Sequence, residues 1–248
     1  INADEVYTET VIAVCRARGL PILSYGENGD RVRLIERIAQ PDGQQLSLNI
    51  DGVTQHLSLP LVGDFQTSNA LCAVSLAIAT GADPDSAVGA LSDLHGAPGR
   101  MERIGMSAAG ATIYVDYAHK PAAMELMLKA LRPHTHGRLA VVFGCGGDRD
   151  TAKRSEMGRI ATTYADAVYV TDDNPRGEDP ASIRREILQG CPTASEIGDR
   201  ATAIAAAIEM LAAGDVLVVA GKGHETGQIV GDETLPFNDA DAVREIIG

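Results

Sequence analysis

Apolar and polar positions follow two different rhythms along the chain, and the change lies near residue 100. In the first part, short segments alternate polar and apolar residues, which predicts strands with one buried and one solvated face. Asp51-Gly52 separates two of these segments and is typical of a two-residue hairpin turn. We therefore predict a small antiparallel meander, with strands at about 21–25, 31–38, 46–50 and 56–61.

Helical spacing of apolar residues flanks this meander. It predicts one helix over about 5–18, which Gly19 ends, and an Ala-rich helix over 70–79. Asp83-Pro84 predicts the start of a third helix, with Asp83 as N-cap and Pro84 at the first helical position. This helix is expected to run to about Leu94.

The second part alternates strands and helices. Runs such as Leu139–Phe143 and Val216–Val219 are continuously apolar, as in parallel strands that are buried on both faces. We predict an open, doubly wound, Rossmann-like α/β domain over 104–248, preceded by a β-rich and helical domain over 1–103. Strands are expected at 112–116, 138–143, 167–171, 193–197 and 215–219, and helices at 121–131, 151–164, 180–189, 199–212 and 239–247.

Composition narrows the class of protein. The 248 residues carry a formal net charge of -13, which argues against non-specific binding to nucleic acid. No apolar run reaches the roughly 20 residues of a membrane span, and the first residues lack the features of a signal peptide. Four cysteines are scattered without a Cys-x-x-Cys pair, as in a reduced cytoplasmic protein. We expect a monomer without nucleic-acid or membrane partners.

Polar residues gather where four of the predicted strands end. These segments are Asp116–Lys120, Gly144–Asp150, Asp172–Arg176 and Gly221–Glu225. In an open parallel sheet, ligands bind outside the carboxyl ends of the strands. We therefore expect the four segments to form one binding site.

The segment Asp172–Arg176 has the most distinctive chemistry. Pro175 stiffens a turn that carries both signs of charge, which suits a zwitterion such as an amino acid. The alternative is a solvated turn with a local Asp–Arg ion pair. Gly221 and Gly223 would let the backbone of the last segment approach a ligand closely.

Several common motifs are absent or uninformative. Neither the dinucleotide fingerprint G-x-G-x-x-G nor the phosphate-binding loop G-x-x-x-x-G-K-[ST] occurs at any position. His134-x-His136 follows Pro133 and is expected to be a solvated turn. Lys222 is expected to be a solvated lysine.

The chain resembles the Mur ligases in five motifs that occur here in that family's order. They are Gly99–Glu102, Asp116–His119, Gly144–Asp150, Asp173–Arg176 and Gly221–Glu225. The resemblance covers essentially the whole chain and is closest to members that add meso-diaminopimelate to UDP-N-acetylmuramoyl-L-alanyl-D-glutamate. The Asp-Asn-Pro-Arg element is specific, because relatives that add lysine differ there.

This resemblance implies the C-terminal portion of a three-domain ligase of peptidoglycan precursor synthesis. Residues 1–103 would end a central ATP-binding domain, and 104–248 would be the C-terminal domain that binds the amino acid. The substrates would be UDP-N-acetylmuramoyl-dipeptide, meso-diaminopimelate and ATP, with Mg²⁺. The family's phosphate loop, carbamylated lysine and most magnesium ligands lie before the segment that resembles Ile1–Asp4. We therefore expect that residues precede Ile1 and that this chain alone is incomplete.

The resemblance also implies individual roles. The expected diaminopimelate site consists of Arg149, Asp173, Asn174, Arg176, Gly221 and Glu225. The expected nucleotide contacts are Asn69 to adenine, Arg100 to phosphate, Asp116 to ribose, and His119 at the nucleotide or metal edge. Gln66 stands where relatives usually have Asn. No catalytic side chain and no metal ligand is assigned within this chain.

Chemistry agrees with these roles. The guanidinium groups of Arg149 and Arg176 offer planar forks for a carboxylate, and Asp173 and Glu225 can offset an ammonium group. Lysine lacks the distal carboxylate, so binding it would leave an arginine unpaired.

Two other functions remain open at this point. One is a relative of folylpolyglutamate or cyanophycin synthetases, which share the domain plan, although Asp-Asn-Pro-Arg argues against it. The other is a non-catalytic fragment that binds the amino acid, which the missing phosphate loop favours.

Overall fold

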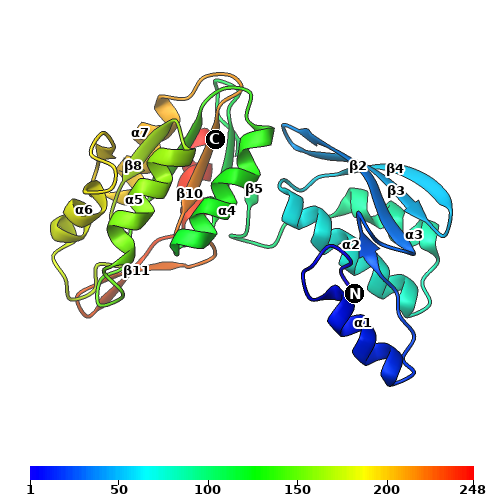
Figure 1. Ribbon diagram of the computed structural model, residues 1–248. Coiled ribbons are helices and arrows are strands. Elements are labelled where there is room, and N and C mark those ends of the chain that lie inside the picture. The colour runs from blue at the N-terminus through cyan, green and yellow to red at the C-terminus, as the bar shows by residue number, and fades with distance from the viewer. The chain divides into compact units, whose positions relative to one another are not determined.

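The computed structural model describes every residue from 1 to 248, in two compact units, Ile1–His95 and Gly96–Gly248 (Figure 1). The predicted domain boundary after Arg103 falls within the second unit and stays a prediction. The compact division lies earlier because β5 (Glu102–Met106) already pairs antiparallel with β6 (Thr112–Asp116). None of the helices is long and apolar enough to cross a membrane.

The first unit contains the predicted meander, except that the strand expected at about 21–25 is reduced to Tyr25–Gly26 and is parallel to its neighbour. Its strands are β1 (Tyr25–Gly26), β2 (Val32–Gln40), β3 (Gly43–Ile50) and β4 (Val53–Leu59), in that spatial order. All neighbours are antiparallel except β1 and β2. Ile50 pairs with Val53, and the residues between them have positive φ, 50° at Asp51 and 90° at Gly52. Two positive φ angles are what a type I′ hairpin turn requires, so the Asp-Gly prediction is confirmed.

Helices cover one face of this small sheet. They are α2 (Asp64–Ala79), α3 (Pro84–Gly89) and the 3₁₀ turn η1 (Ala90–Asp93). Alternate residues of β3 point into the core that these helices close, and are at most 2% exposed: Leu46, Leu48 and Ile50. The alternation seen in the sequence thus defines the buried face of the sheet.

The starts of these helices show what local sequence signals predict. The Asp83 side chain accepts a hydrogen bond from the Ser86 N–H and caps α3, as predicted. In contrast, α2 begins at Asp64, before the predicted start at residue 70. Asp64 stabilises the first turn through the helix dipole, and the turn at Gly63, with φ of 93°, precedes it. Asn69 therefore lies within a helix and not ahead of one.

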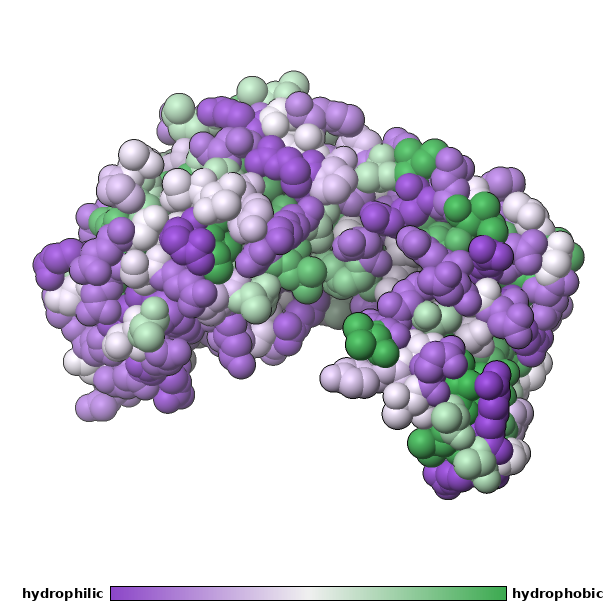
Figure 2. Space-filling view, viewed as in Figure 1, coloured by the Kyte–Doolittle hydropathy of each residue, from purple (hydrophilic) through white to green (hydrophobic).

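The first helix, α1 (Thr8–Ala17), forms as predicted but does not bury its apolar side chains in this unit. Val11 is 44% exposed and Val14 is 53% exposed. The resulting apolar surface is visible as green side chains over α1 (Figure 2). The apolar spacing therefore predicted the helix correctly, but not a buried face.

The second unit is the predicted open α/β domain. Its sheet has the order β5-β6-β10-β7-β8-β9, and all neighbours are parallel except β5 and β6. The remaining strands are β7 (Leu139–Phe143), β8 (Ala167–Val170), β9 (Ser195–Glu196) and β10 (Val216–Ala220). The edge strand β5 was not predicted, because an irregular register between Arg103 and Gly105 interrupts its alternation.

Helices cover both faces of this sheet (Figure 1). The first face carries α4 (Pro121–Leu131), α5 (Lys153–Tyr164) and α6 (Pro180–Leu188), and the second carries α7 (Arg200–Glu209) and α8 (Asp239–Ile247). All residues of β7 and β10 are buried, which explains their continuous apolar runs. A small hairpin, β11 (Gly227–Val230) and β12 (Glu233–Pro236), was not predicted, because no buried face marks it.

The motif His134-x-His136 behaves only partly as predicted. His136 is exposed, whereas His134 is 2% exposed. The difference arises because the 3₁₀ turn η2 (Arg132–His134) continues α4 and places His134 on its buried side. The interpretation as a solvated turn is therefore wrong for His134.

Candidate functional site

Four polar loops leave the sheet of the second unit at one level. Ala220, the last residue of β10, pairs with Asp116 of β6 and with Phe143 of β7. Phe143 in turn pairs with Val170, the last residue of β8. Because these strands are parallel, the loops that follow them start side by side. The strand register therefore brings the four polar segments together.

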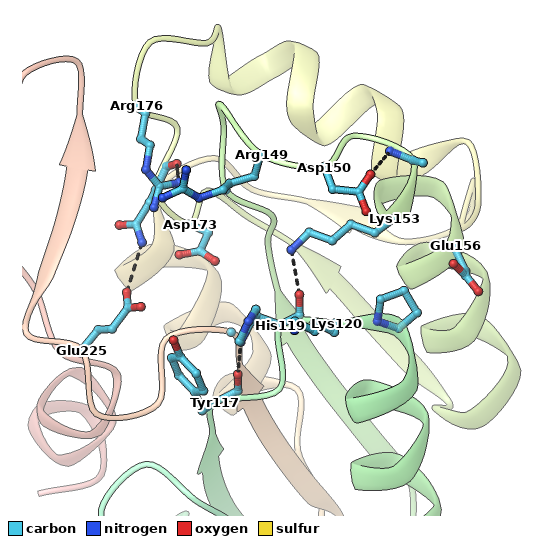
Figure 3. A pocket seen from close by; sticks show the side chains of 15 residues that line it. Tyr117, His119, Lys120, Arg149, Asp150, Lys153, Glu156, Asp173, Arg176 and Glu225 are labelled. Carbon is cyan, nitrogen blue, oxygen red and sulfur yellow. Dashed lines mark hydrogen bonds between the residues drawn. The ribbon is translucent and has the colours of Figure 1, made fainter.

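A cavity of about 660 Å³ lies at this edge (Figure 3). It is lined by all six residues expected at the amino-acid site, namely Arg149, Asp173, Asn174, Arg176, Gly221 and Glu225. His119 lines it too, together with Tyr117 and Lys120 from the same loop. Lys153 and Glu156 of α5 also line the cavity, and sequence reasoning missed both.

Two guanidinium groups reach into the cavity without a carboxylate partner. One Arg176 nitrogen, Nη1, donates to the carbonyl oxygens of Gly147 and Asn174, at 2.9 and 3.3 Å. Arg149 Nη1 donates to the Asp148 carbonyl at 3.3 Å. Neither arginine takes part in an ion pair, unlike Arg154, Arg184 and Arg200 nearby. The two side chains lie close together in Figure 3, so both can donate to one carboxylate.

Two carboxylates face the same cavity. Asp173 is 7% exposed and Asn174 is 6% exposed, and both belong to the turn after β8. Asn174 Nδ2 donates to Glu225 Oε2 at 3.1 Å, which connects this turn to the loop after β10. The cavity is therefore lined by cationic groups on one side and by anionic groups beside them, as a zwitterionic ligand requires.

The prediction for Lys222 is wrong. The lysine was expected to be solvated, but its side chain is 0% exposed. Its ammonium group lies 2.9 Å from Asn174 Oδ1, 3.4 Å from Asp173 Oδ1 and 3.3 Å from Glu225 Oε2. Gly221 and Gly223 on either side, with φ of 115° and 55°, turn the chain so that this lysine points inward. No local sequence signal distinguished it from a solvated lysine.

The glycine loop after β7 packs against the Asp-Asn-Pro-Arg turn. A Cβ atom on Gly147 would lie 1.9 Å from the Pro175 carbonyl oxygen, so only glycine fits there. The Gly147 N–H donates to the Asn174 carbonyl at 2.9 Å. This contact holds Arg149 and Arg176, which come from different loops, on the same cavity.

Arg154 holds the other end of the glycine loop, and no local sequence pattern predicted this role. Its side chain is 1% exposed and pairs with Glu178 at 2.9 Å and with Glu186 at 3.0 Å. Glu178 also accepts a hydrogen bond from the Asp148 N–H. The pKa of the Glu178 carboxyl is lowered, chiefly by its hydrogen bond from Arg154. A buried arginine thus fixes the position from which Arg149 extends.

The residues expected to contact the nucleotide lie in both units. Asn69 belongs to α2 of the first unit and donates to Gln66 Oε1 at 3.3 Å. Arg100, Asp116 and His119 belong to the second unit. The structure therefore brings the last three together within one unit, whereas Asn69 lies in the other.

The Tyr117 ring contacts two of these three residues, Arg100 and His119. The guanidinium carbon of Arg100 lies 4.5 Å from the centroid of its ring, and the His119 ring packs at 4.6 Å. The Asp116 carboxylate accepts hydrogen bonds from the N–H groups of Met101 and Ala118, both at 2.8 Å. Burial raises the pKa of the Asp116 carboxyl, and these two hydrogen bonds offset the shift in part. The two N–H groups hold the Asp116 carboxylate in a fixed orientation.

Lys153 connects the two parts of the cavity. Its ammonium group donates to the His119 carbonyl at 2.7 Å and lies across from Arg149 (Figure 3). It has no carboxylate partner within ion-pair distance. It thus adds a third unpaired cation to the cavity.

The residues of this chain do not by themselves fit a magnesium site. No group of three or more His, Cys, Asp or Glu side chains is placed to hold a metal ion. Asp116, the one carboxylate among the expected nucleotide contacts, already accepts hydrogen bonds from two backbone N–H groups. We assign no step to a metal held by this chain.

Comparison with known proteins agrees with this geometry. Residues 99–223 match the family described as "Mur ligase, glutamate ligase domain", and residues 1–77 match the "Mur ligase middle domain". The protein of Mesorhizobium japonicum named UDP-N-acetylmuramoyl-L-alanyl-D-glutamate--2,6-diaminopimelate ligase is 51% identical over 98% of this chain and 50% of its own length. The protein of the same name from Zymomonas mobilis is 50% identical over 100% of this chain and 52% of its own length. The chain thus spans about half the length of the curated relatives it matches.

Solved structures give the same result. A structure of UDP-N-acetylmuramoyl-L-alanyl-D-glutamate--2,6-diaminopimelate ligase is 35% identical, with a TM-score of 0.78 over 100% of this chain and 52% of that one. Folylpolyglutamate synthase of Mycobacterium tuberculosis is 23% identical, with a TM-score of 0.61 over 86% of this chain and 49% of that one. The second likeness concerns the fold alone.

Proposed function

The chain belongs to the Mur ligase family, and on this premise we propose that it is the amino-acid-binding portion of a ligase that adds meso-diaminopimelate to UDP-N-acetylmuramoyl-L-alanyl-D-glutamate. Relatives that carry the name of this activity are about half identical to the chain over nearly all of its length. Because the chain spans about half of each relative, the activity itself is proposed for the complete enzyme.

One observation carries the choice of amino acid. Arg149 and Arg176 face the cavity without carboxylate partners, and Asp173 and Glu225 face it beside them. Diaminopimelate has a carboxylate and an ammonium group at each end. Its distal carboxylate would pair with the two guanidinium groups, and its distal ammonium group with the two carboxylates. The other end would then remain free to react.

Lysine fits this arrangement poorly. It has no distal carboxylate, so it would leave the two guanidinium groups without a counter-charge. Sites built to bind a polar group can reject an analogue that lacks it by roughly 10⁴–10⁵ in catalytic efficiency. The arginine pair is therefore proposed as the origin of specificity.

The proposed reaction requires little covalent chemistry from side chains. ATP transfers its terminal phosphoryl group to the side-chain carboxylate of the D-glutamate. The free amine of diaminopimelate attacks the acyl phosphate, and phosphate and a proton leave as the amide bond forms. The residues of this chain hold the amine in place for attack, and this positioning accelerates the reaction. Arg100, Asp116, His119 and Asn69 are proposed as contacts to the nucleotide.

Free thiols support a reducing compartment, which we propose to be the cytoplasm. None of the four cysteines forms a disulfide. Burial raises the pKa of the Cys145 thiol to about 12, so this cysteine beside the site is unreactive.

Calorimetric titration of the 248-residue chain tests the proposal. We expect meso-diaminopimelate to bind, and lysine and glutamate to bind at least about 10-fold more weakly, because hydrogen bonds to charged groups are worth about 1.5–3 kcal/mol. Binding of lysine as tight as that of diaminopimelate would contradict the proposed substrate. Preferential binding of glutamate would instead favour a relative of the folylpolyglutamate synthetases.

A binding function without turnover is the second candidate for this polypeptide. The absence of a phosphate-binding G-x-x-x-x-G-K-[ST] loop from the sequence favours it. In that case the 248-residue chain binds diaminopimelate but hydrolyses no ATP. ATP turnover as fast as that of a complete ligase would exclude this candidate.

A further inference from the structure

Lys222 is a fully buried charged group behind the cavity wall, and the proposed function gives it no role. It follows β10 directly and its side chain is 0% exposed. An ammonium group has three N–H donors, and three oxygens surround this one, from Asp173, Asn174 and Glu225. These oxygens come from two loops, so one lysine connects both halves of the anionic wall.

Lys222 determines how Asn174 presents its amide. Asn174 Oδ1 accepts from Lys222 Nζ and from the Ile229 N–H, both at 2.9 Å, so both of its lone pairs are used. The amide nitrogen must then face Glu225, to which it donates at 3.1 Å. Asn174 therefore keeps one N–H for a ligand and has no oxygen to offer.

The two carboxylates each keep one oxygen free. Lys222 and Asn174 use Glu225 Oε2, and Lys222 uses Asp173 Oδ1. Glu225 Oε1 and Asp173 Oδ2 accept no hydrogen bond. The buried side-chain atoms that lack a hydrogen-bond partner are Ser75 Oγ and Arg154 Nε, so these two carboxylate oxygens are not buried. Both oxygens are thus accessible from the cavity that the two residues line.

Charge counting gives the same picture. Lys222 contributes one positive charge to a group with two carboxylates, Asp173 and Glu225, which leaves one negative charge over. Arg200, another buried cation, donates twice to Asp239, at 2.7 and 2.8 Å, and is balanced by that carboxylate. A ligand with one ammonium group would balance this part of the wall.

We infer that Lys222 is a positioning residue of the amino-acid site, which orients Asn174 and leaves Glu225 Oε1 and Asp173 Oδ2 to bind the ammonium group of the ligand. This inference rests on the proposed function, because it concerns the same cavity and the same class of ligand. Lys222 itself donates no hydrogen bond to the ligand. Its effect is transmitted through the three side chains that it holds.

The alternative is that Lys222 only stabilises the two loops. The two roles differ in which ligand they affect. Pimelate has the two carboxylates of diaminopimelate but no ammonium group, so it uses the arginines and not the anionic wall. Loss of a positioning residue weakens diaminopimelate selectively, whereas disordered loops weaken both ligands.

The experiment measures both ligands by NMR titration of the 248-residue chain, its Lys222→Met variant and the exposed control Lys129→Met. We expect Lys222→Met to weaken diaminopimelate by about 30-fold or more, as for loss of one partner of a buried charge pair, and pimelate by less than about threefold. The control should bind both ligands as the parent does. Equal losses for the two ligands, or undiminished binding of diaminopimelate by Lys222→Met, would overturn the inference alone. A parent chain that binds no diaminopimelate would remove the proposed function as well.

A second measurement needs no variant, in case Lys222→Met does not fold. The chain has four lysines, and of these only Lys222 is buried. Its ammonium protons should exchange slowly with water and give a resolved ¹⁵N signal, unlike those of the other lysines. Addition of diaminopimelate should shift this signal, because the ligand binds the same carboxylates, whereas ATP alone should not. An unchanged signal at saturating diaminopimelate would overturn the inference.

Discussion

The guanidinium group of Arg200 donates two hydrogen bonds to the carboxylate of Asp239, and both side chains are completely buried. Arg200 begins α7 and Asp239 begins α8, so the pair joins the two helices on one face of the sheet. Arg200 also donates to the carbonyl oxygen of Ala220 at 3.0 Å, where β10 ends and the site begins. A structural ion pair thus fixes the level from which the Gly221–Glu225 loop starts.

Replacing one partner of this pair should destabilise the protein strongly. Asp239→Ala leaves the arginine buried and uncompensated, which typically costs about 3–5 kcal/mol. Chemical denaturation measures the loss as a change in the free energy of unfolding. The double variant Arg200→Met, Asp239→Leu should be more stable than Asp239→Ala, because it buries no charge.

An exposed ion pair provides the control. Arg31 and Asp51 form hydrogen bonds of 2.8 and 2.7 Å, but their side chains are 43% and 45% exposed. Asp51 lies in a turn with positive φ, so the informative change is Arg31→Ala, which should cost less than about 1 kcal/mol. A loss for Asp239→Ala no larger than for Arg31→Ala would show that the buried pair is not the anchor of α7 and α8.

Gly99→Ala should disturb the site through backbone contact. Gly99 has φ of 66°, and a Cβ atom there would lie 2.1 Å from the His224 nitrogen. The contacted atom belongs to the backbone, so the loop around His224 must shift to make room for the Cβ atom. We expect the free energy of unfolding to fall by about 1–3 kcal/mol and diaminopimelate to bind more weakly. Gly110→Ala is the matched control, since Gly110 has φ of 86° but its nearest neighbour lies at 3.9 Å. Similar binding by the two variants would mean that the Gly99 contact does not hold the site.

Periodicity and turn chemistry predicted most of the fold. The runs Leu139–Phe143 and Val216–Ala220 are apolar because both faces of the sheet are covered, and Asp51-Gly52 forms its turn through local φ preferences. Elements without a buried face or with an irregular register, β5, β11 and β12, gave no such signal. Their pairing depends on tertiary contacts that a local pattern does not contain.

The site was predictable only in part for a similar reason. Polar residues at four strand ends indicate a site because topology brings such ends together. The segment Asp172–Arg176, however, divides its side chains: Asp172 forms an ion pair with Arg184, while Asp173 and Arg176 line the cavity. Burial of Lys222 depends on backbone turns at the neighbouring glycines, which composition does not reveal.

The cap of α7 should make stability depend on pH. The Asp199 carboxylate accepts from the hydroxyl and the N–H of Thr202, at 2.5 and 2.8 Å, and these two hydrogen bonds lower the pKa of this carboxyl. Because the pKa is lower in the folded protein, the unfolded state takes up the proton at a higher pH than the folded state. The stabilisation by the ionised Asp199 is therefore fully present above the ordinary pKa of 3.8 and is lost as the pH falls through the folded-state pKa. Asp199→Ala should cost about 1 kcal/mol at pH 7 and less at pH 3, measured by urea denaturation. A cost that does not change between these two pH values would contradict the role of the ionised cap.

Arg176→Ala should separate recognition of the amino acid from folding. Arg176 donates to the Gly147 carbonyl, and its backbone N–H and carbonyl pair with Ile229 and Gly231, so the turn keeps its backbone contacts when the side chain is removed. The lost guanidinium group would have paired with the distal carboxylate, and hydrogen bonds to charged groups are worth about 1.5–3 kcal/mol, or about 10- to 150-fold in affinity.

Calorimetry of the complete enzyme with diaminopimelate and with ATP measures this difference. We expect a loss of at least about tenfold for diaminopimelate and little change for ATP, because the expected nucleotide contacts are other residues. Arg185→Ala is the control, since Arg185 is exposed and outside the cavity. Equal losses for both ligands, accompanied by a lower melting temperature, would assign Arg176 to the integrity of the turn and remove it from specificity.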